Sequence, residues 1–150
     1  MEQSITGNIV LQSIKKVSRR GMFQKPEAGK WAAHWIERLR IKTRDVENPV
    51  STLSGGNQQK VVLARNLMSA PKLLILNCPT VGVDIGSKME ISALIQQVAG
   101  EGMAVILISD DPGEILTNCR RFFMMKNGEI HREYKSSDYT DSTLYAELVR

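Results

Sequence analysis

Residues 53–65 read LSGGNQQKVVLAR, and this stretch decides the fold. Ser54 is a residue type that favours helix N-caps, and Gly55 and Gly56 leave the backbone N–H groups beside it open to close approach. Apolar residues then recur along one side of residues 57–69, which predicts a helix. Free N–H groups and the positive end of a helix dipole favour an anion by about 0.3–1 kcal/mol. The pattern leaves two interpretations open: a phosphate-binding turn, or an ordinary capped helix after a Gly-Gly turn.

Short apolar runs and helical stripes alternate downstream of this motif. Continuous apolar runs at residues 73–76 and 104–108 predict strands that are buried on both faces. Apolar residues at helical spacing over residues 91–98 predict a helix between these strands, and a short helix is expected at residues 112–116. Repeated strand and helix units imply an α/β fold with a parallel sheet.

The C-terminal part of the chain predicts a hairpin and a last helix. An apolar strand at residues 122–125 runs into the turn Lys126-Asn127-Gly128-Glu129, and Asn-Gly between apolar flanks is a strong hairpin signal. Residues 140–150 have the pattern of one amphipathic helix.

The N-terminal third is helical and basic. Residues 1–50 hold ten Lys and Arg against five Asp and Glu, a net charge of +5, whereas residues 51–150 hold ten against eleven, a net charge of −1. Apolar stripes predict helices over residues 9–17 and over residues 31–39, the second starting after Pro26 and Gly29, and residues 43–52 are expected to form a loop. The region lacks a nucleic-acid reading motif, so a solvated or protein-facing surface is favoured and no nucleic-acid partner is expected.

Composition excludes several classes of protein. A chain of 150 residues is one domain at most. No apolar run approaches the length of about 18 residues that spans a membrane, and the N-terminus lacks the pattern of a signal peptide. Cys78 and Cys119 are too few for a disulfide framework, so reduced thiols and a cytosolic location are expected.

Residues 53–65 closely resemble the signature motif of ABC-transporter ATPases, and their NQQK variant looks like the branch that powers ribose, xylose and related monosaccharide importers. Later landmarks follow in the order of that family: residues 73–80 resemble the Walker B strand, 82–84 the D-loop, 105–111 the switch strand and 122–130 the C-terminal hairpin. The resemblance implies a partial P-loop-NTPase-like parallel sheet with helices. It also implies three parts, in which residues 1–50 form the helical subdomain that docks on the permease, residues 51–135 carry the nucleotide motifs and residues 136–150 form a C-terminal helix.

The resemblance also implies a site that is shared between subunits. In the family's head-to-tail dimer, the signature of one subunit covers ATP that the P-loop of another subunit holds. By this resemblance the ATP-binding residues are Ser54, Gly55, Gly56, Gln58 and Asp84. The implied cofactors are ATP and Mg²⁺, both through a partner. The implied partners are a P-loop-bearing ATPase subunit or a second copy, and a membrane permease, with the chain peripheral on the inner face of the cell membrane.

Three positions depart from the family pattern. Its Walker B strand ends in Asp-Glu, where the Asp holds Mg²⁺ through water and the Glu polarises the attacking water; here Asn77 and Cys78 stand instead. An amide carries no charge for a hard cation, and losing a general base alone costs about 10²–10⁴ in rate. Asp110 occupies the switch position, usually His, and would place negative charge near a γ-phosphate. No catalytic residue or metal ligand is therefore assigned, and hydrolysis by this chain alone is not expected.

The P-loop pattern G-x-x-x-x-G-K-[ST] is absent from the sequence. The only Gly-Lys pair, Gly29-Lys30, is followed by Trp31 and has Gln24 in place of the first Gly. We therefore expect a chain that corresponds to the C-terminal part of a nucleotide-binding domain. Such a chain would leave apolar edges on residues 73–76 and 104–108, which predicts marginal stability or dimerisation.

Three alternatives remain beside this interpretation. The first is a non-catalytic remnant or regulatory interaction module without nucleotide turnover. The second makes Cys78 a nucleophile or redox switch, which needs a base or cation beside it, yet His34 and His131 are both distant in sequence. The third, an arm of an ABC-type DNA-repair ATPase, suits the basic N-terminus but lacks the long coiled coils of those proteins.

Overall fold

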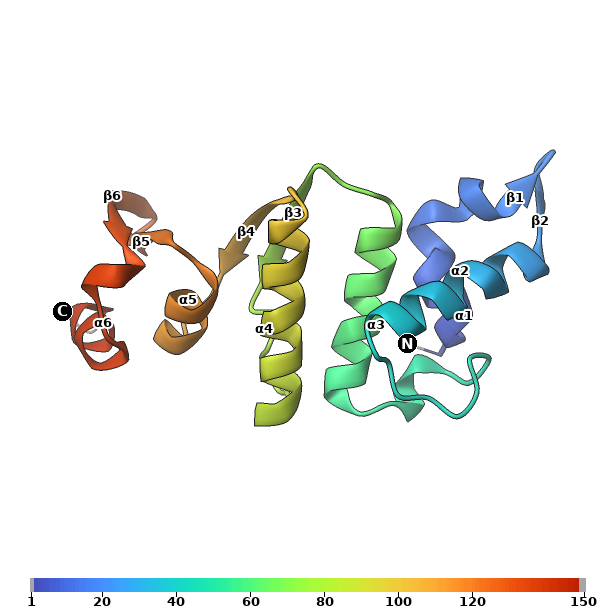
Figure 1. Cartoon of the computed structure of the whole chain (residues 1–150), viewed down its shortest axis with the longest axis horizontal. Helices are drawn as coiled ribbons and strands as arrows, with labels where there is room; N and C mark the ends of the chain where they lie inside the picture. The colour runs from blue at the N-terminus through green and yellow to red at the C-terminus, as the bar shows by residue number, and fades with distance from the viewer. Residues whose placement is uncertain (1, 149–150) are drawn as a thin grey trace.

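The computed structural model describes residues 2–148, and the chain runs along the long axis of an elongated molecule (Figure 1). The α-helices of the described residues are α1 (Ile5–Val10), α2 (Lys25–Arg38), α3 (Gly55–Met68), α4 (Ile85–Gly100), α5 (Pro112–Asn118) and α6 (Asp141–Leu148). Short 3-10 helices are η1 (Leu11–Val17), η2 (Val50–Thr52) and η3 (Ser136–Asp138). The strands are β1 (Ser18–Arg19), β2 (Met22–Phe23), β3 (Leu73–Asn77), β4 (Ala104–Ile108), β5 (Arg121–Lys126) and β6 (Glu129–Lys135), paired as β1–β2, β3–β4 and β5–β6.

The N-terminal helices pack on α3. Ser4 caps α1 by accepting a hydrogen bond from Gly7 N at 3.0 Å. The buried core continues from this helix through α2 and α3 into α4, and its members include Ile5, Ile9, Trp35, Val61, Leu67 and Ile91. Helix α2 begins at Lys25, so the expected start after Gly29 was wrong. The reason is that Pro26 lies in the first turn, where its missing N–H breaks no helical hydrogen bond.

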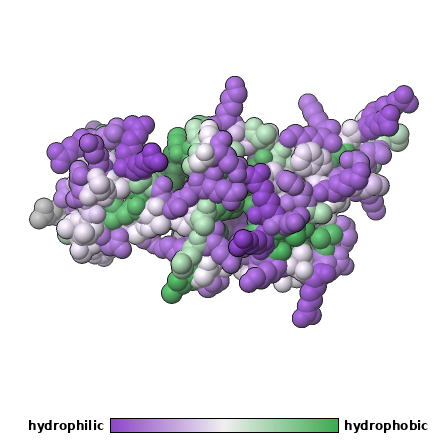
Figure 2. All heavy atoms as spheres, in the orientation of Figure 1, coloured by the Kyte–Doolittle hydropathy of each residue, from purple (hydrophilic) through white to green (hydrophobic). Residues whose placement is uncertain are grey.

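Strands β3 and β4 form a parallel pair with Leu73 opposite Ala104 and Asn77 opposite Ile108. Leu74 and Leu76 face the core, but Leu73, Ile75, Ile106 and Ile108 are about half exposed. The expectation of strands buried on both faces was therefore wrong, because nothing in residues 2–148 covers the second face. Green, hydrophobic atoms reach the surface over this region in Figure 2. The predicted marginal stability or dimerisation stays a prediction.

The β5–β6 hairpin confirms the turn that was predicted at Asn127-Gly128. Both residues have positive φ, 54° and 81°, which asparagine and glycine tolerate well. Phe122 stacks on Tyr134 at 5.3 Å between ring centroids, and α6 packs on α5. The predicted last helix is present as α6; its final two residues, 149 and 150, lie outside the described part of the chain.

A second hairpin, β1–β2, was not predicted. Its turn is Arg20-Gly21, and its strands are only two residues long. It projects at the end of the molecule opposite α6, beyond the helices (Figure 1). Within residues 2–148, no helix is long and apolar enough to cross a bilayer.

Candidate functional site

The start of α3 presents free backbone donors. Ser54 occupies the N-cap position, and the first backbone hydrogen bond runs from Gln58 N to Ser54 O at 2.9 Å. The Ser54 hydroxyl makes no capping bond; it accepts from Asn57 Nδ2 at 2.9 Å instead. No hydrogen bond within the described chain therefore takes up the N–H groups of Gly55, Gly56 and Asn57. The predicted cap position is confirmed, but the side-chain cap is not made, and that leaves this end of the helix open to an anion.

A basic groove lies beside this helix start. It measures about 840 Å³, and its lining includes Lys42, Arg44, Ser54 and Asn57. Asn57 fixes the groove wall, because its Oδ1 accepts a hydrogen bond from Lys42 N at 2.8 Å. Neither Lys42 nor Arg44 enters an ion pair with a described residue. The sequence interpretation had missed both as site residues, although they belong to the basic excess of residues 1–50.

Gln58 lies at the same helix start but folds back on its own loop. Its Nε2 donates to Leu53 O at 2.8 Å, and the residue is half-buried. Gln58 therefore shapes the turn that exposes Ser54. Its backbone N–H and its side-chain amide nitrogen each already donate a hydrogen bond within this turn.

Gly56 packs directly against the start of α4. A Cβ at this position would lie 2.1 Å from Ser87 Oγ and 2.4 Å from Ser87 Cβ. A Cβ on Gly55 would lie 3.3 Å from Gly82 O. The two glycines therefore let α3 approach the start of α4 and the segment that was expected to resemble the D-loop.

Asp84 caps α4 at this contact. Its carboxylate accepts from Ser87 N at 2.9 Å and from Ser87 Oγ at 2.8 Å. These hydrogen bonds, the backbone one first, hold the pKa of Asp84 below its usual value, so the exposed carboxylate is ionised at neutral pH. The structure thus links Asp84 to Gly56 through Ser87, while Gly55 approaches Gly82 two residues before Asp84.

The three departing residues gather at the carboxyl edge of the β3–β4 pair. Asn77 ends β3, and Cys78 N donates to Ile108 O at 2.8 Å. Cys78 has φ of +47°, an uncommon conformation for a residue with a Cβ. Asp110 is exposed two residues beyond β4. Residues 2–148 contain no cluster of three or more His, Cys, Asp or Glu that fits a metal ion, and both cysteines are free thiols.

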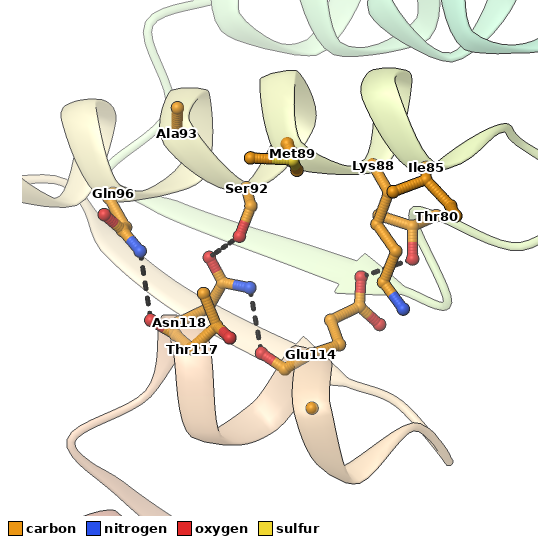
Figure 3. Close-up of a pocket in the computed structure, with 11 residues that line it drawn as sticks. Thr80, Ile85, Lys88, Met89, Ser92, Ala93, Gln96, Glu114, Thr117 and Asn118 are labelled. Carbon is orange, nitrogen blue, oxygen red and sulfur yellow. Dashed lines mark hydrogen bonds between the residues drawn. The ribbon is translucent and has the colours of Figure 1, made fainter.

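A second groove, of about 420 Å³, lies between α4 and α5 (Figure 3). Its polar groups largely satisfy one another: Thr80 Oγ1 donates to the buried Glu114 Oε1 at 2.8 Å, and Ser92 Oγ donates to Asn118 Oδ1 at 2.6 Å. Lys88 pairs with Asp111, which raises the pKa of the lysine and lowers that of the aspartate. These bonds hold α5, and with it the segment of Asp110, against α4.

Lys60 belongs to the signature stretch and ties α3 to α4. Its side chain is 4% exposed, and Nζ donates to Glu90 Oε2 at 2.5 Å and to Arg40 O at 3.3 Å. Glu90 is 48% exposed, and the hydrogen bond from Lys60 lowers its pKa. The pair is therefore asymmetric, since a buried ammonium meets a carboxylate that water also solvates.

We expect Glu90→Gln to destabilise the protein more than Lys60→Met. Replacing the carboxylate with an amide leaves the buried ammonium with neutral acceptors only, the glutamine amide oxygen and Arg40 O, which costs about 1–2 kcal/mol, whereas removing Lys60 leaves a solvated carboxylate and keeps the packing. Urea denaturation at pH 7 measures both free energies of unfolding.

The pH dependence provides the control for this pair. Because the folded pKa of Glu90 is depressed, its contribution is present above the usual glutamate pKa and is lost as the pH falls through the folded value. In Glu90→Gln the free energy of unfolding should therefore fall less steeply as the pH is lowered through this acid range. Equal losses for the two variants at pH 7 would contradict the asymmetry.

The parallel strands, the helix start at Ser54 and the adjoining α4 cap are arranged as in part of an ATP-binding cassette. The chain belongs to the ABC transporter family, because the family model for ABC transporters matches residues 2–81. It is 38% identical to a ribose import ATP-binding protein of Streptomyces coelicolor over 97% of this chain, and 45% identical to one of Lactococcus lactis over 87%. It spans only 29% and 26% of those two proteins.

Solved structures agree on the fold. An ATP-binding cassette of an ABC transporter superimposes with a TM-score of 0.80 at 19% identity, over 99% of this chain and 63% of that one. A dimeric cassette bound to ADP and Pi superimposes with a TM-score of 0.74 at 26% identity, over 89% of this chain and 57% of that one. The predicted α/β cassette fold is confirmed.

Proposed function

We propose that the chain contributes the signature half of a shared ATP site in a sugar-importing ABC transporter. The observation that carries the proposal is the open start of α3. There the backbone N–H groups of Gly55, Gly56 and Asn57 have no hydrogen-bond partner in the described chain, and the exposed Ser54 hydroxyl lies next to them. Backbone donors at a helix start favour a phosphate oxygen. Lys42 and Arg44 line the adjoining groove and add positive charge.

The phosphate would come from ATP held by another subunit. The sequence has no P-loop, and ATP phosphates need such a cradle of N–H groups together with its lysine. The proposed partner is a P-loop-bearing ATPase subunit or a second copy, with Mg²⁺ bound on its side. Sugar import is proposed because the relatives from Streptomyces and Lactococcus are named ribose import proteins. Docking on a permease through residues 1–50, at the inner face of the membrane, belongs to the same proposal.

Hydrolysis by this chain alone is not part of the proposed function. β3 ends at Asn77 and Cys78 follows it, at the two positions that resemble the family's Asp-Glu pair, and Asp110 is exposed at the position that resembles the switch. The amide of Asn77 and the thiol of Cys78 therefore do not supply the Mg²⁺ ligand and the general base that an Asp-Glu pair would supply. In the proposed complex this chain would contact the γ-phosphate, and the partner subunit would carry the groups that hydrolyse ATP.

ATP-dependent association tests the proposal. The purified chain is mixed with a P-loop-bearing cassette whose own hydrolysis is blocked, and complex formation is followed by light scattering. We expect a complex with ATP and Mg²⁺ but none with ADP, because the γ-phosphate completes the contact with α3. Mg²⁺-dependent turnover by the chain alone would overturn the mechanism.

The second candidate is a regulatory interaction module without nucleotide turnover. Asn77 and Cys78 favour it, because they remove the groups that hydrolysis needs. This candidate predicts association that is the same with ATP, with ADP and without nucleotide. The scattering experiment therefore separates the two functions.

A further inference from the structure

The hairpin β1–β2 carries exposed cations and apolar side chains that take no part in the proposed ATP site. We define the basic hairpin patch as Arg19, Arg20, Met22, Phe23 and Lys25. Met22 is 65% exposed and Phe23 is 44% exposed, although both are large apolar residues. Arg19, Arg20 and Lys25 are exposed as well, and none of them enters an ion pair with a residue of the described range 2–148.

The register of the hairpin interleaves the two kinds of side chain. Arg19 pairs with Met22 and Ser18 pairs with Phe23, so opposite partners share a face of the ribbon. Gln24 N donates to Val17 O at 2.8 Å and closes the base of the hairpin, beyond which Lys25 begins α2. The cation Arg19 therefore lies beside the apolar Met22 on one face of a fixed projection, whereas Phe23 lies with Ser18 on the other face. In Figure 2, purple atoms project at this end of the molecule with pale green atoms beside them.

The turn places an arginine where the backbone disfavours one. Arg20 and Gly21 have φ of 51° and 79°, close to the 54° and 81° of Asn127 and Gly128 in the β5–β6 turn. Asparagine fits the first of these positions far better than arginine, because its short polar side chain tolerates a positive φ. The chain uses asparagine in one hairpin and arginine in the other. The arginine at the tip of β1–β2 therefore occupies a backbone conformation that disfavours its residue type.

We propose that the basic hairpin patch binds the surface of a membrane that contains anionic phospholipid. Lipid phosphates match the unpaired cations, and residues 1–50 carry a net charge of +5 that extends the attraction. Met22 and Phe23 are suited to the boundary between headgroups and acyl chains. The proposal does not depend on the ATP site, because the patch lies on a different element from α3.

Vesicle co-sedimentation tests the proposal with the full chain. The probe is a set of vesicles of phosphatidylcholine with 30% phosphatidylglycerol, compared with pure phosphatidylcholine, at about 50 mM salt, where screening is weak. We expect binding to the anionic vesicles only, and weaker binding as salt is raised. Arg19→Gln combined with Arg20→Asn should reduce the partition coefficient about 30-fold, the expected effect of two cations near a charged surface. Asparagine suits the positive φ of position 20, so this variant keeps the turn.

The control variant is Lys126→Gln combined with Lys135→Gln, which removes two exposed cations from the β5–β6 hairpin and lowers the net charge equally. It should change partition only a few-fold. Met22→Thr with Phe23→Thr should weaken binding while leaving its salt dependence unchanged. Equal losses for the two double charge variants would overturn the proposal. Absence of vesicle binding by the wild type, together with binding to immobilised polyglutamate, would overturn it in favour of an acidic protein surface.

Discussion

Replacing Gly56 with alanine is expected to lower the free energy of unfolding by about 2–3 kcal/mol, the upper part of the usual range for overpacking. The new Cβ would lie 2.1 Å from Ser87 Oγ and 2.4 Å from Ser87 Cβ, far inside van der Waals contact. Ser87 Oγ could rotate away only by losing its hydrogen bond to Asp84, and Ser87 Cβ is fixed to the backbone, so α3 and α4 must move apart. Urea denaturation followed by circular dichroism measures the loss.

Two further variants isolate this contact. Gly29→Ala is the matched control, because Gly29 lies inside α2 and a Cβ added there would meet nothing within 4 Å; it should gain about 0.5–1 kcal/mol from helix propensity. Ser87→Gly removes both clashing atoms, and the next nearest atom, Ser87 Cα, lies at 3.7 Å, an ordinary contact distance. The double variant Gly56→Ala with Ser87→Gly should therefore lose less than the sum of the single losses, with a coupling of about 1 kcal/mol or more. Additive losses would show that the two helices do not meet as described.

The elements that local patterns decide were predicted well. Helix α3 follows from the apolar stripe after two glycines, and the β5–β6 turn follows from the tolerance of Asn127 and Gly128 for positive φ. The β1–β2 turn was missed for the same reason in reverse, since Arg20 is not a residue type that signals such a turn. A turn can therefore be predicted from the sequence only where its residues are of the types that favour its backbone conformation.

Properties that depend on distant residues were not accessible from the sequence. Continuous apolar runs at β3 and β4 predict burial but do not say what covers each face, and one face is open in the described chain. The contact of Gly56 with Ser87 joins two helices that are separated by a strand and its loops, and no periodicity reports it. Likewise, Lys42 reaches the site because its N–H binds the side chain of Asn57. Motif resemblance indicated the helix start of the candidate site, and tertiary contacts form the groove beside it.

The site and the packing depend on the same few residues at the start of α3. Gly56 serves the contact with α4, whereas Ser54 is exposed and its hydroxyl bonds only Asn57 of its own turn. A change at Gly56 would therefore disturb binding through the fold, and a change at Ser54 would disturb it directly. Function is best tested at Ser54.

Ser54→Arg is expected to weaken ATP-dependent association with a P-loop-bearing cassette about 100-fold. A hydrogen bond to a charged group contributes about 1.5–3 kcal/mol, and the arginine side chain would also occupy the space in front of the free N–H groups of Gly55 and Gly56. Its charge would attract phosphate, so a loss of binding would show that shape and hydrogen bonding at the helix start matter more than charge. Titration of the chain into the partner, with ATP and Mg²⁺ present, gives the two dissociation constants.

Ser69→Arg is the matched control, because Ser69 is exposed at the other end of α3 and the substitution adds the same charge and bulk. It should leave association within about twofold, and both variants should unfold at the same urea concentration as the wild type, since surface changes usually alter stability by no more than about 0.5 kcal/mol. Equal association by Ser54→Arg and the wild type would contradict a γ-phosphate contact at α3. Association without nucleotide that neither variant changes would instead favour the regulatory module, because that function has no use for the open helix start.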